Sequence, residues 1–183
     1  MNFPILSTLI LLPLIGSVFI FFNKSSEKNR TIKYVSIFIT FSNFLLSLYL
    51  WYIFDKSISD FQFIEDREWI SGLINYKVGI DGISILFVVL TAFITPLCVI
   101  YVISTIKYRL KDFLIAILIM ESLMIGVFCS LDLVVFYLFF EGGLIPMFLI
   151  IGIWGGERRV YSAFKFFLYT LLGSVLMLSL IHI

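Results

Sequence analysis

The chain has 183 residues, of which 61% are hydrophobic and only 14% are charged, and its mean hydropathy is +1.11. Soluble domains are about 45–50% apolar and about 25% charged, so this composition leaves too little polar surface for a water-soluble protein. The formal net charge is +1, and no block of basic residues is interleaved with aromatic residues. The sequence therefore predicts a lipid bilayer as the surroundings of the chain, and no nucleic acid partner.

Six apolar segments are long enough to cross a membrane as helices, because about 20 residues at 1.5 Å each span a hydrocarbon core about 30 Å thick. In chain order they cover residues 3–22, 33–54, 80–103, 113–130, 133–154 and 161–183. No positive residue precedes the first segment and no cleavage site follows it, which favours a retained helix over a signal peptide. The segments are too long and too continuously apolar for barrel strands. The predicted fold is all-α, a polytopic transmembrane helical bundle.

The connections between these segments alternate in charge. The first, third and fifth are basic, and they carry Lys24, Lys28, Arg30, Lys33, Lys107, Arg109, Lys111, Arg158 and Arg159. The long second connection, residues 55–79, holds more acidic than basic residues. Cytoplasmic loops carry an excess of Lys and Arg. We therefore expect the three basic connections on the cytoplasmic side, and both ends of the chain on the other side.

An acidic residue interrupts the fifth segment, in the stretch FYLFFEGGLIPMFL at residues 136–149. A charged side chain at the bilayer centre costs roughly 2.5–3.5 kcal/mol on insertion scales, and such residues usually mark functional sites. Glu141 lies about 20 Å from the cytoplasmic end of its segment at 1.5 Å per residue. Burial disfavours the charged form of a carboxylate, so we expect Glu141 to hold and pass a proton.

Two further charged residues lie within predicted spans. Glu121 is about 13 Å from the cytoplasmic start of the fourth segment, and a very short turn joins this segment to the fifth. We therefore expect antiparallel neighbours, in which Glu121 and Glu141 share a polar cavity. Lys165 differs from Glu141 by about 12 Å in depth, so a water-mediated link is expected rather than a direct ion pair. The alternative for Lys165 is that its long side chain extends to the membrane interface.

The backbone beside Glu141 contains Gly142, Gly143 and Pro146. Pro146 has no N–H to donate and its ring clashes with the carbonyl of Gly142, which predicts a kink and a free carbonyl beside the carboxylate. Glycine also permits close approach of helices. The alternative is that Gly and Pro are simply more frequent in transmembrane helices.

The remaining residues of interest are predicted to have structural roles. Asp81 and Asp132 each stand where an apolar segment begins, and we expect both to cap helix N-termini. Cys98 and Cys129 lie inside apolar segments and are interpreted as small apolar residues. No G-x-G-x-x-G, P-loop, metal-ligand spacing or nucleophile triad is present. The sequence predicts no catalytic residue, no cofactor-binding site and no metal site in this chain.

Two stretches resemble one family. VGIDGISILFVVLT, residues 78–91, resembles the start of the third helix of chain M (chain 4) of proton-pumping NADH:quinone oxidoreductase, respiratory complex I. DLVVFYLFFEGGLIPMFLIIGIWGG, residues 132–156, is similar to the fifth helix of that antiporter-like subunit family, in its alphaproteobacterial and mitochondrial branch. The ERRVYSAFKFFLYTLLGS that follows also matches.

The resemblance implies a subunit of the proton-pumping membrane arm of an enzyme complex, in a bacterial or mitochondrial inner membrane. The glutamate that matches Glu141 is the family's key carboxylate, and the positions matching Glu121 and Lys165 are polar contributors in some members. NADH, FMN, iron–sulfur clusters and quinone are then expected on other subunits, with other membrane subunits as partners and protons as the transported species. Residues 1–130 would form four N-terminal helices, and residues 131–183 the start of the antiporter-like module.

The chain also departs from that family. Family members have more than twice as many helices, in two inverted repeats, and their fifth-helix glutamate pairs with a lysine on the seventh helix. This chain stops in its sixth span, and its last residues, SLIHI, resemble a translated sequencing adapter. We therefore expect the gene to continue beyond Ile183, with a non-native end in this sequence. Two alternatives stay open: the membrane chain of a multisubunit sodium/proton antiporter, and a non-functional truncated remnant.

Overall fold

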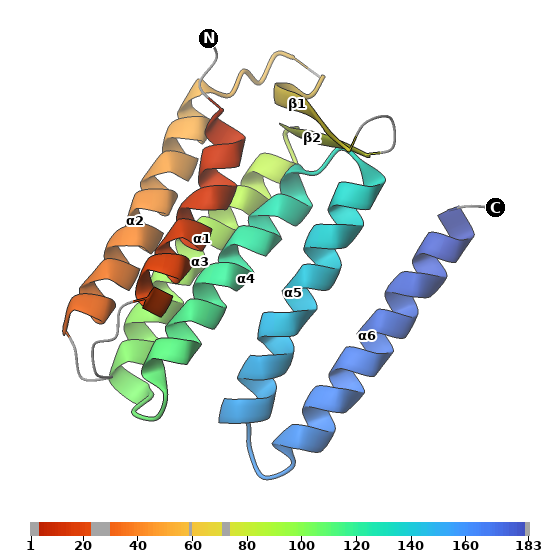
Figure 1. Cartoon of the computed structure of the whole chain (residues 1–183). Coiled ribbons are helices and arrows are strands. Elements are labelled where there is room, and N and C mark those ends of the chain that lie inside the picture. Colours follow the sequence, from red (N-terminus) through yellow and green to blue (C-terminus); the bar gives the residue numbers. More distant parts are fainter. Residues whose placement is uncertain (1–3, 23–29, 59, 71–73, 182–183) are drawn as a thin grey trace.

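The computed structural model describes residues 4–22, 30–58, 60–70 and 74–181. Figure 1 shows these residues as a bundle of helices with a small hairpin at one end. The elements are α1 Ile5–Phe22, α2 Arg30–Ile53, β1 Gln62–Ile70, β2 Ile74–Ile80, α3 Ser84–Thr105, α4 Leu110–Cys129, α5 Leu133–Trp154 and α6 Arg159–Ile181. All six helices are long and apolar enough to cross a membrane. The predicted transmembrane bundle is thus confirmed, and the chain is a multi-pass membrane protein.

Most helices begin and end within three residues of the predicted segments. The exception is the third, which was expected from residue 80 and begins at Ser84, because β2 occupies the residues up to Ile80. Residues 3, 182 and 183 of the predicted spans lie outside the described residues. Hydropathy predicts the spans correctly because a helix that crosses the hydrocarbon core needs apolar side chains along nearly its whole length.

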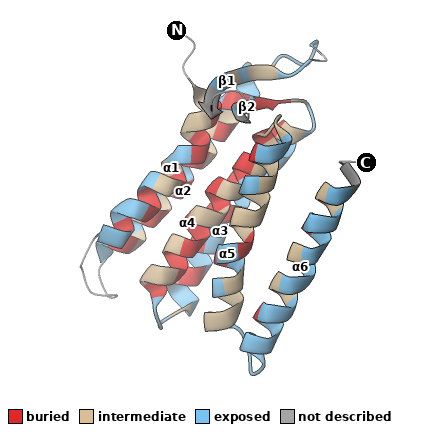
Figure 2. Cartoon of the chain, turned by 45° about the vertical axis from the view of Figure 1, so that its right-hand side comes forward, coloured by how far each residue is buried: buried red, intermediate tan, exposed pale blue. Residues whose placement is uncertain are grey.

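Helix α4 is the centre of the bundle. It packs against α1, α3 and α5, whereas α6 packs mainly against α5 and forms one edge. Figure 2 shows the consequence, since buried positions concentrate on α4 and its neighbours while most of α6 is exposed. The largest fully buried apolar side chains include Leu6, Leu9, Ile20, Leu50, Ile85, Leu114, Leu118 and Ile125.

The connection between α2 and α3 contains a two-stranded antiparallel hairpin that the sequence analysis did not predict. At its end of the bundle, the hairpin is hydrogen-bonded to the start of α1 and to the turn between α4 and α5. Glu65 of β1 accepts hydrogen bonds from the backbone N–H groups of Leu6 (3.0 Å) and Ser7 (3.3 Å) at the start of α1. On β2, the carbonyl of Lys77 accepts from the N–H of Leu131, in the turn between α4 and α5, at 2.9 Å. The hairpin therefore closes the end of the bundle opposite the basic connections.

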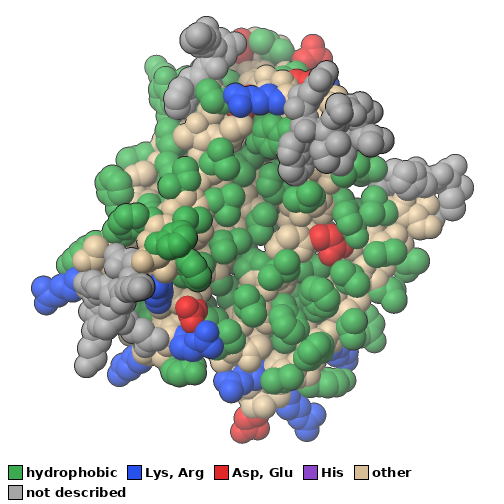
Figure 3. Space-filling view, viewed as in Figure 1, with side chains coloured by type: hydrophobic (Ala, Val, Ile, Leu, Met, Phe, Trp, Pro, Cys, Tyr) green, Lys and Arg blue, Asp and Glu red, His purple; other side chains and the backbone are tan. Residues whose placement is uncertain are grey.

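Most charged side chains visible in Figure 3 sit at the two ends of the bundle, and apolar side chains cover most of the middle, where an acidic side chain is also visible. The starts of α2, α4 and α6 lie at the same end (Figure 1), and near them are Arg30, Lys107, Arg109, Lys111, Arg158 and Arg159. Lys24 and Lys28 fall outside the described residues. All the described basic connections thus gather at one end, as the alternating pattern predicted, and their placement on the cytoplasmic side stays a prediction.

Candidate functional site: a carboxylate held between two transmembrane helices

Glu141 stands near the middle of α5, and its side chain is half-buried. The Ser174 hydroxyl of α6 donates a hydrogen bond to its Oε1, and the same hydroxyl is 2.9 Å from the carbonyl of Leu171. Glu141 is therefore turned toward α6. The contact joins α5 and α6 near the middle of α5.

The three backbone residues predicted beside the site have different surroundings. Helix α5 continues through Gly142, Gly143 and Pro146. A Cβ placed on Gly142 would lie 3.3 Å from Cδ2 of Leu123 on α4, so this glycine sits where the two helices approach closely. A Cβ on Gly143 would meet nothing within 4 Å. Pro146 is buried and cannot donate a backbone hydrogen bond. Only Gly142 has a visible steric reason, and the kink stays a prediction.

Glu121 is buried, with 2% of its surface exposed, and it points to another part of the bundle. Its Oε1 accepts a hydrogen bond of 2.8 Å from Nδ2 of Asn43 on α2. Asn43 was not among the predicted site residues. The sequence does contain a pattern that points to it. Four polar residues recur at spacings of four, three and four, which places them on one helix face: Ser36, Thr40, Asn43 and Ser47.

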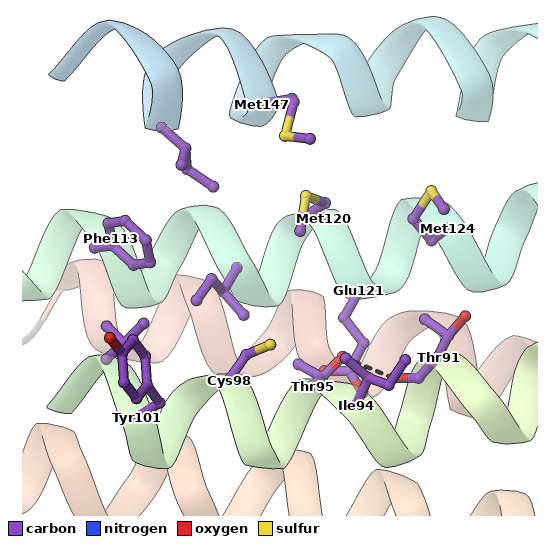
Figure 4. Close-up of a pocket in the computed structure, with 13 residues that line it drawn as sticks. Thr91, Ile94, Thr95, Cys98, Tyr101, Phe113, Met120, Glu121, Met124 and Met147 are labelled. Atoms are coloured by element: carbon purple, nitrogen blue, oxygen red, sulfur yellow. Dashed lines mark hydrogen bonds between the residues drawn. The ribbon is translucent and has the colours of Figure 1, made fainter. Parts of the chain in front are cut away.

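The predicted shared cavity of the two carboxylates is not found among the described residues. Helices α4 and α5 are neighbours, as expected, but Glu121 contacts α2 and Glu141 contacts α6. A cavity of about 390 Å³ between α3, α4 and α5 is lined by Glu121 and not by Glu141. Figure 4 shows Glu121 reaching from α4 toward Thr91 and Thr95 of α3, away from Met147 of α5. Glu121 and Glu141 lie at similar depth but do not meet, because Glu121 projects from α4 toward α2 while Glu141 projects from α5 toward α6.

Lys165 also lies apart from Glu141. It is nine residues before Ser174, so at about 100° per residue the two side chains leave α6 on opposite faces. Lys165 is exposed, and its Nζ lies 5.9 Å from the ring centroids of both Tyr161 and Tyr169, one turn to either side. These distances are those of cation–π contacts. No ion pair between Lys165 and Glu141 occurs among the described residues.

The predicted cap at Asp132 is confirmed, whereas the N-cap residue of α3 is Ile83, and Asp81 stands two residues before it. Asp132 Oδ1 accepts hydrogen bonds from the N–H groups of Val134 (2.9 Å) and Val135 (3.1 Å) at the start of α5. Asp81 Oδ1 accepts from the N–H of Ser84 at 2.7 Å, and the Ser84 hydroxyl accepts from the N–H of Asp81 at 2.8 Å. The hydrogen bonds from Ser84, first from its backbone, hold the pKa of the Asp81 carboxyl below its ordinary value.

Comparison with known proteins adds a family context. Residues 130–183 match the family model described as NADH:quinone oxidoreductase/Mrp antiporter, TM. NADH-quinone oxidoreductase subunit M of Rhodobacter capsulatus is 59% identical over 150 residues, which cover 82% of this chain and 29% of that protein. The subunit M of Rickettsia prowazekii (strain Madrid E) is 45% identical over 187 residues, covering 100% of this chain and 38% of its own length. NADH-ubiquinone oxidoreductase chain 4 of Marchantia polymorpha is 48% identical over 175 residues, which cover 94% of this chain and 35% of that protein.

A solved structure supports the fold. A chain in the structure of the membrane-bound sulfane sulfur reductase, an archaeal respiratory membrane complex, matches with a TM-score of 0.76 and 18% identity, covering 95% of this chain and 26% of that one. At this identity the likeness concerns the fold alone. The chain spans 29–38% of the length of these three curated relatives. Within that span, the sequence identifies the chain as a homologue of subunit M, or chain 4, of NADH:quinone oxidoreductase.

Proposed function

We propose that this chain takes part in proton translocation coupled to respiratory electron transport, with Glu141 as the proton carrier at mid-membrane. The observation that carries the proposal is a half-buried carboxylate in the middle of an apolar helix, hydrogen-bonded by Ser174 of the next helix. An ionisable group at this depth is costly unless it has a function. The homology to subunit M supports the same assignment.

The pair of Glu141 and Ser174 suits a group that gains and loses a proton. A hydroxyl has one donor and two acceptor positions, so it can donate to an ionised carboxylate or accept from a protonated one. Neither helix has to move for the hydrogen bond to survive the change. The carbonyl of Gly142, which Pro146 cannot satisfy, is a further acceptor beside the site. The proposal therefore needs only side-chain rotations at Glu141 itself.

Glu121 and Lys165 have secondary roles in this proposal. Neither contacts Glu141, so each acts through water or through another group. Residues 1–130 supply the supporting helices and residues 131–183 begin the module that carries the proton. The enzyme is NADH:quinone oxidoreductase as a whole, with NADH, FMN, iron–sulfur clusters and quinone on other subunits. Other membrane subunits of that complex are the partners of this chain.

The test replaces Glu141 by Gln in the chain as it is encoded in its host. We expect the complex to assemble, as seen on a native gel, and NADH-driven acidification of inverted membrane vesicles to fall to a small fraction of the parental rate. Glu121→Gln is the matched control, since it makes the same change in the neighbouring helix, and it should reduce pumping much less. Parental pumping by the Glu141→Gln complex would refute the assigned role.

A sodium/proton antiporter chain is the second candidate, because the matching family model covers Mrp antiporters as well. The two functions differ in their energy source. Vesicles that contain the chain should acidify on addition of NADH under our proposal, and on addition of a sodium gradient without NADH under the alternative. Sodium-driven exchange that is lost in Glu141→Gln, with no NADH-driven pumping in the parent, would favour the antiporter.

A further inference from the structure

The buried face of α2 is polar rather than apolar in its middle. Ser36, Thr40, Asn43 and Ser47 are all fully buried. Three of them bond within their own helix, since the hydroxyls of Ser36, Thr40 and Ser47 donate to carbonyls three or four residues earlier at 2.7–3.2 Å. Asn43 alone reaches another helix, where it donates to Glu121. Among the described residues, the contact of Asn43 with Glu121 is therefore the one polar link from this stripe to α4.

The two side chains leave matching atoms unsatisfied. Asn43 Nδ2 donates to Glu121 Oε1, while Asn43 Oδ1 and Glu121 Oε2 are buried and have no hydrogen-bond partner among the described residues. Both orphan atoms are acceptors if Glu121 is ionised. A proton on Oε2 would turn one of them into a donor and leave the other as an acceptor. A carboxylic acid and a carboxamide can then form two hydrogen bonds side by side in one ring.

We propose that Glu121 is a neutral carboxylic acid that Asn43 holds by two hydrogen bonds, with Nδ2 donating to Oε1 and the Oε2 hydroxyl donating to Oδ1. Asn43 is then a positioning residue for a buried proton. The arrangement satisfies every polar atom of the pair, as buried polar groups require. The site lies between α2 and α4, on the other side of α4 from Glu141, and is separate from the carrier assigned above.

The surroundings of the pair favour the neutral form. No charged residue is on the buried face of α2, which consists of Ile32, Ser36, Thr40, Asn43, Ser47 and Leu50, and α1 contains none. On α3, Cys98 and Tyr101 are the titratable groups that line the cavity beside Glu121. On α5, the Glu141 side chain contacts α6 instead. An ionised Glu121 would be a buried charge without a cation and with a single hydrogen bond, which is strongly unfavourable.

Whether this proton moves during turnover rests on the proposed function, but its presence at neutral pH does not. Infrared difference spectroscopy on the assembled complex tests its presence directly. We expect the Glu121→Gln complex to lack a carbonyl-stretching band of a protonated carboxylic acid that the parent shows and that shifts in heavy water. Glu141→Gln must leave this band in place, which separates the inference from the role of Glu141. If Glu121→Gln removes no acid band, Glu121 is ionised and the proposal is wrong.

Variants of Asn43 test its role as a positioning residue. Asn43→Leu keeps most of the volume but removes both hydrogen bonds, so the Glu121 acid band should move to higher frequency. Ser47→Ala is the matched control one turn away, because its hydroxyl bonds only its own helix, and the band should not change. Asn43→Ser, whose short side chain can bond its own helix as Ser47 does, serves the same purpose if the Leu variant does not assemble. An unchanged band in the assembled Asn43 variant would overturn the two-point hydrogen bond.

Discussion

Ser174 of α6 donates a hydrogen bond to the Glu141 carboxylate of α5, whereas Lys165 of α6 points away from α5. Within the described residues, the partner of the mid-membrane carboxylate is thus a neutral hydroxyl and not a cation. A hydroxyl tolerates both protonation states of Glu141, while a fixed cation would favour the ionised one. This difference makes Ser174 the residue whose replacement is most informative about how the carboxylate works.

Ser174→Ala should slow proton pumping without preventing assembly. A hydrogen bond to a charged group contributes about 1.5–3 kcal/mol, so we expect a loss of about 10- to 150-fold if the bond forms in the rate-limiting state. Initial rates of NADH-driven acidification in inverted vesicles measure the loss. Ser174→Thr restores a hydroxyl and should recover most of the rate.

The control for Ser174 is Thr170→Val, one turn earlier on α6. The Thr170 hydroxyl donates to the carbonyl of Phe166 at 2.8 Å, within its own helix. Its loss should therefore leave pumping near the parental rate. Equal losses in Ser174→Ala and Thr170→Val would show that the α5–α6 packing, and not the hydrogen bond to Glu141, controls the rate.

The sequence predicted the spans and the Asp132 cap because both depend on local chemistry. A helix in lipid needs a continuous apolar run, and a cap needs only an acceptor next to free N–H groups. Asp132 satisfies that condition within three residues along the chain, and Asp81 accepts from the first N–H of α3 over the same separation. Such contacts can be found without knowing which helices are neighbours.

The hairpin and the directions of the buried carboxylates depend on contacts distant in sequence. Glu65 is 59 residues from Leu6, and Asn43 is 78 residues from Glu121. Depth along a helix could be computed from 1.5 Å per residue, but the face on which a side chain leaves could not be assigned before the neighbours were known. That is why Glu121 and Glu141 were expected to share a cavity and instead contact α2 and α6.

The α4–α5 interface should not tolerate a side chain at Gly126. A Cβ placed there would lie 2.7 Å from the ring of Phe139, which a large aromatic side chain in a packed interface cannot easily avoid. Overpacking typically costs about 1–3 kcal/mol, so Gly126→Ala should lower thermal stability in detergent. Gly143→Ala is the control, because nothing lies within 4 Å of its Cβ position. Equal stability of both variants would mean that Phe139 moves aside at little cost.

The start of α3 should weaken in acid through Asp81. Folding lowers the pKa of this carboxyl, because Ser84 donates hydrogen bonds to it. Its contribution to stability is therefore complete above the unfolded pKa of about 3.9 and is lost as the pH falls through the lower folded value. Amide hydrogen exchange at Ser84 and Ile85 should accelerate in that window beyond the intrinsic pH effect. In Asp81→Asn, which keeps an acceptor but does not titrate, the excess acceleration should vanish.

Glu65 should hold the hairpin on the bundle through the N-terminus of α1. Its carboxylate accepts from the N–H groups of Leu6 and Ser7 and from the Ser7 hydroxyl, which also lies 3.2 Å from the hydroxyl of Tyr76. Burial raises the pKa of Tyr76, so this phenol keeps its proton at neutral pH. Loss of an N-cap acceptor costs about 0.5–2 kcal/mol, and loss of a charge at the helix N-terminus costs about 0.3–1 kcal/mol.

Glu65→Ala should therefore expose the hairpin to proteolysis and lower thermal stability. Glu65→Gln keeps an acceptor and loses the charge, so its cleavage rate and thermal stability should lie between those of the parent and of Glu65→Ala. Limited digestion of the assembled complex, followed by mass spectrometry of the fragments, measures the effect. Asp66→Ala on the same strand is the control, because Asp66 is exposed and its oxygen lies 4.0 Å from Lys77, where an ion pair contributes little. Faster cleavage in Asp66→Ala than in Glu65→Ala would show that the strand pairing, and not the contact with α1, fixes the hairpin.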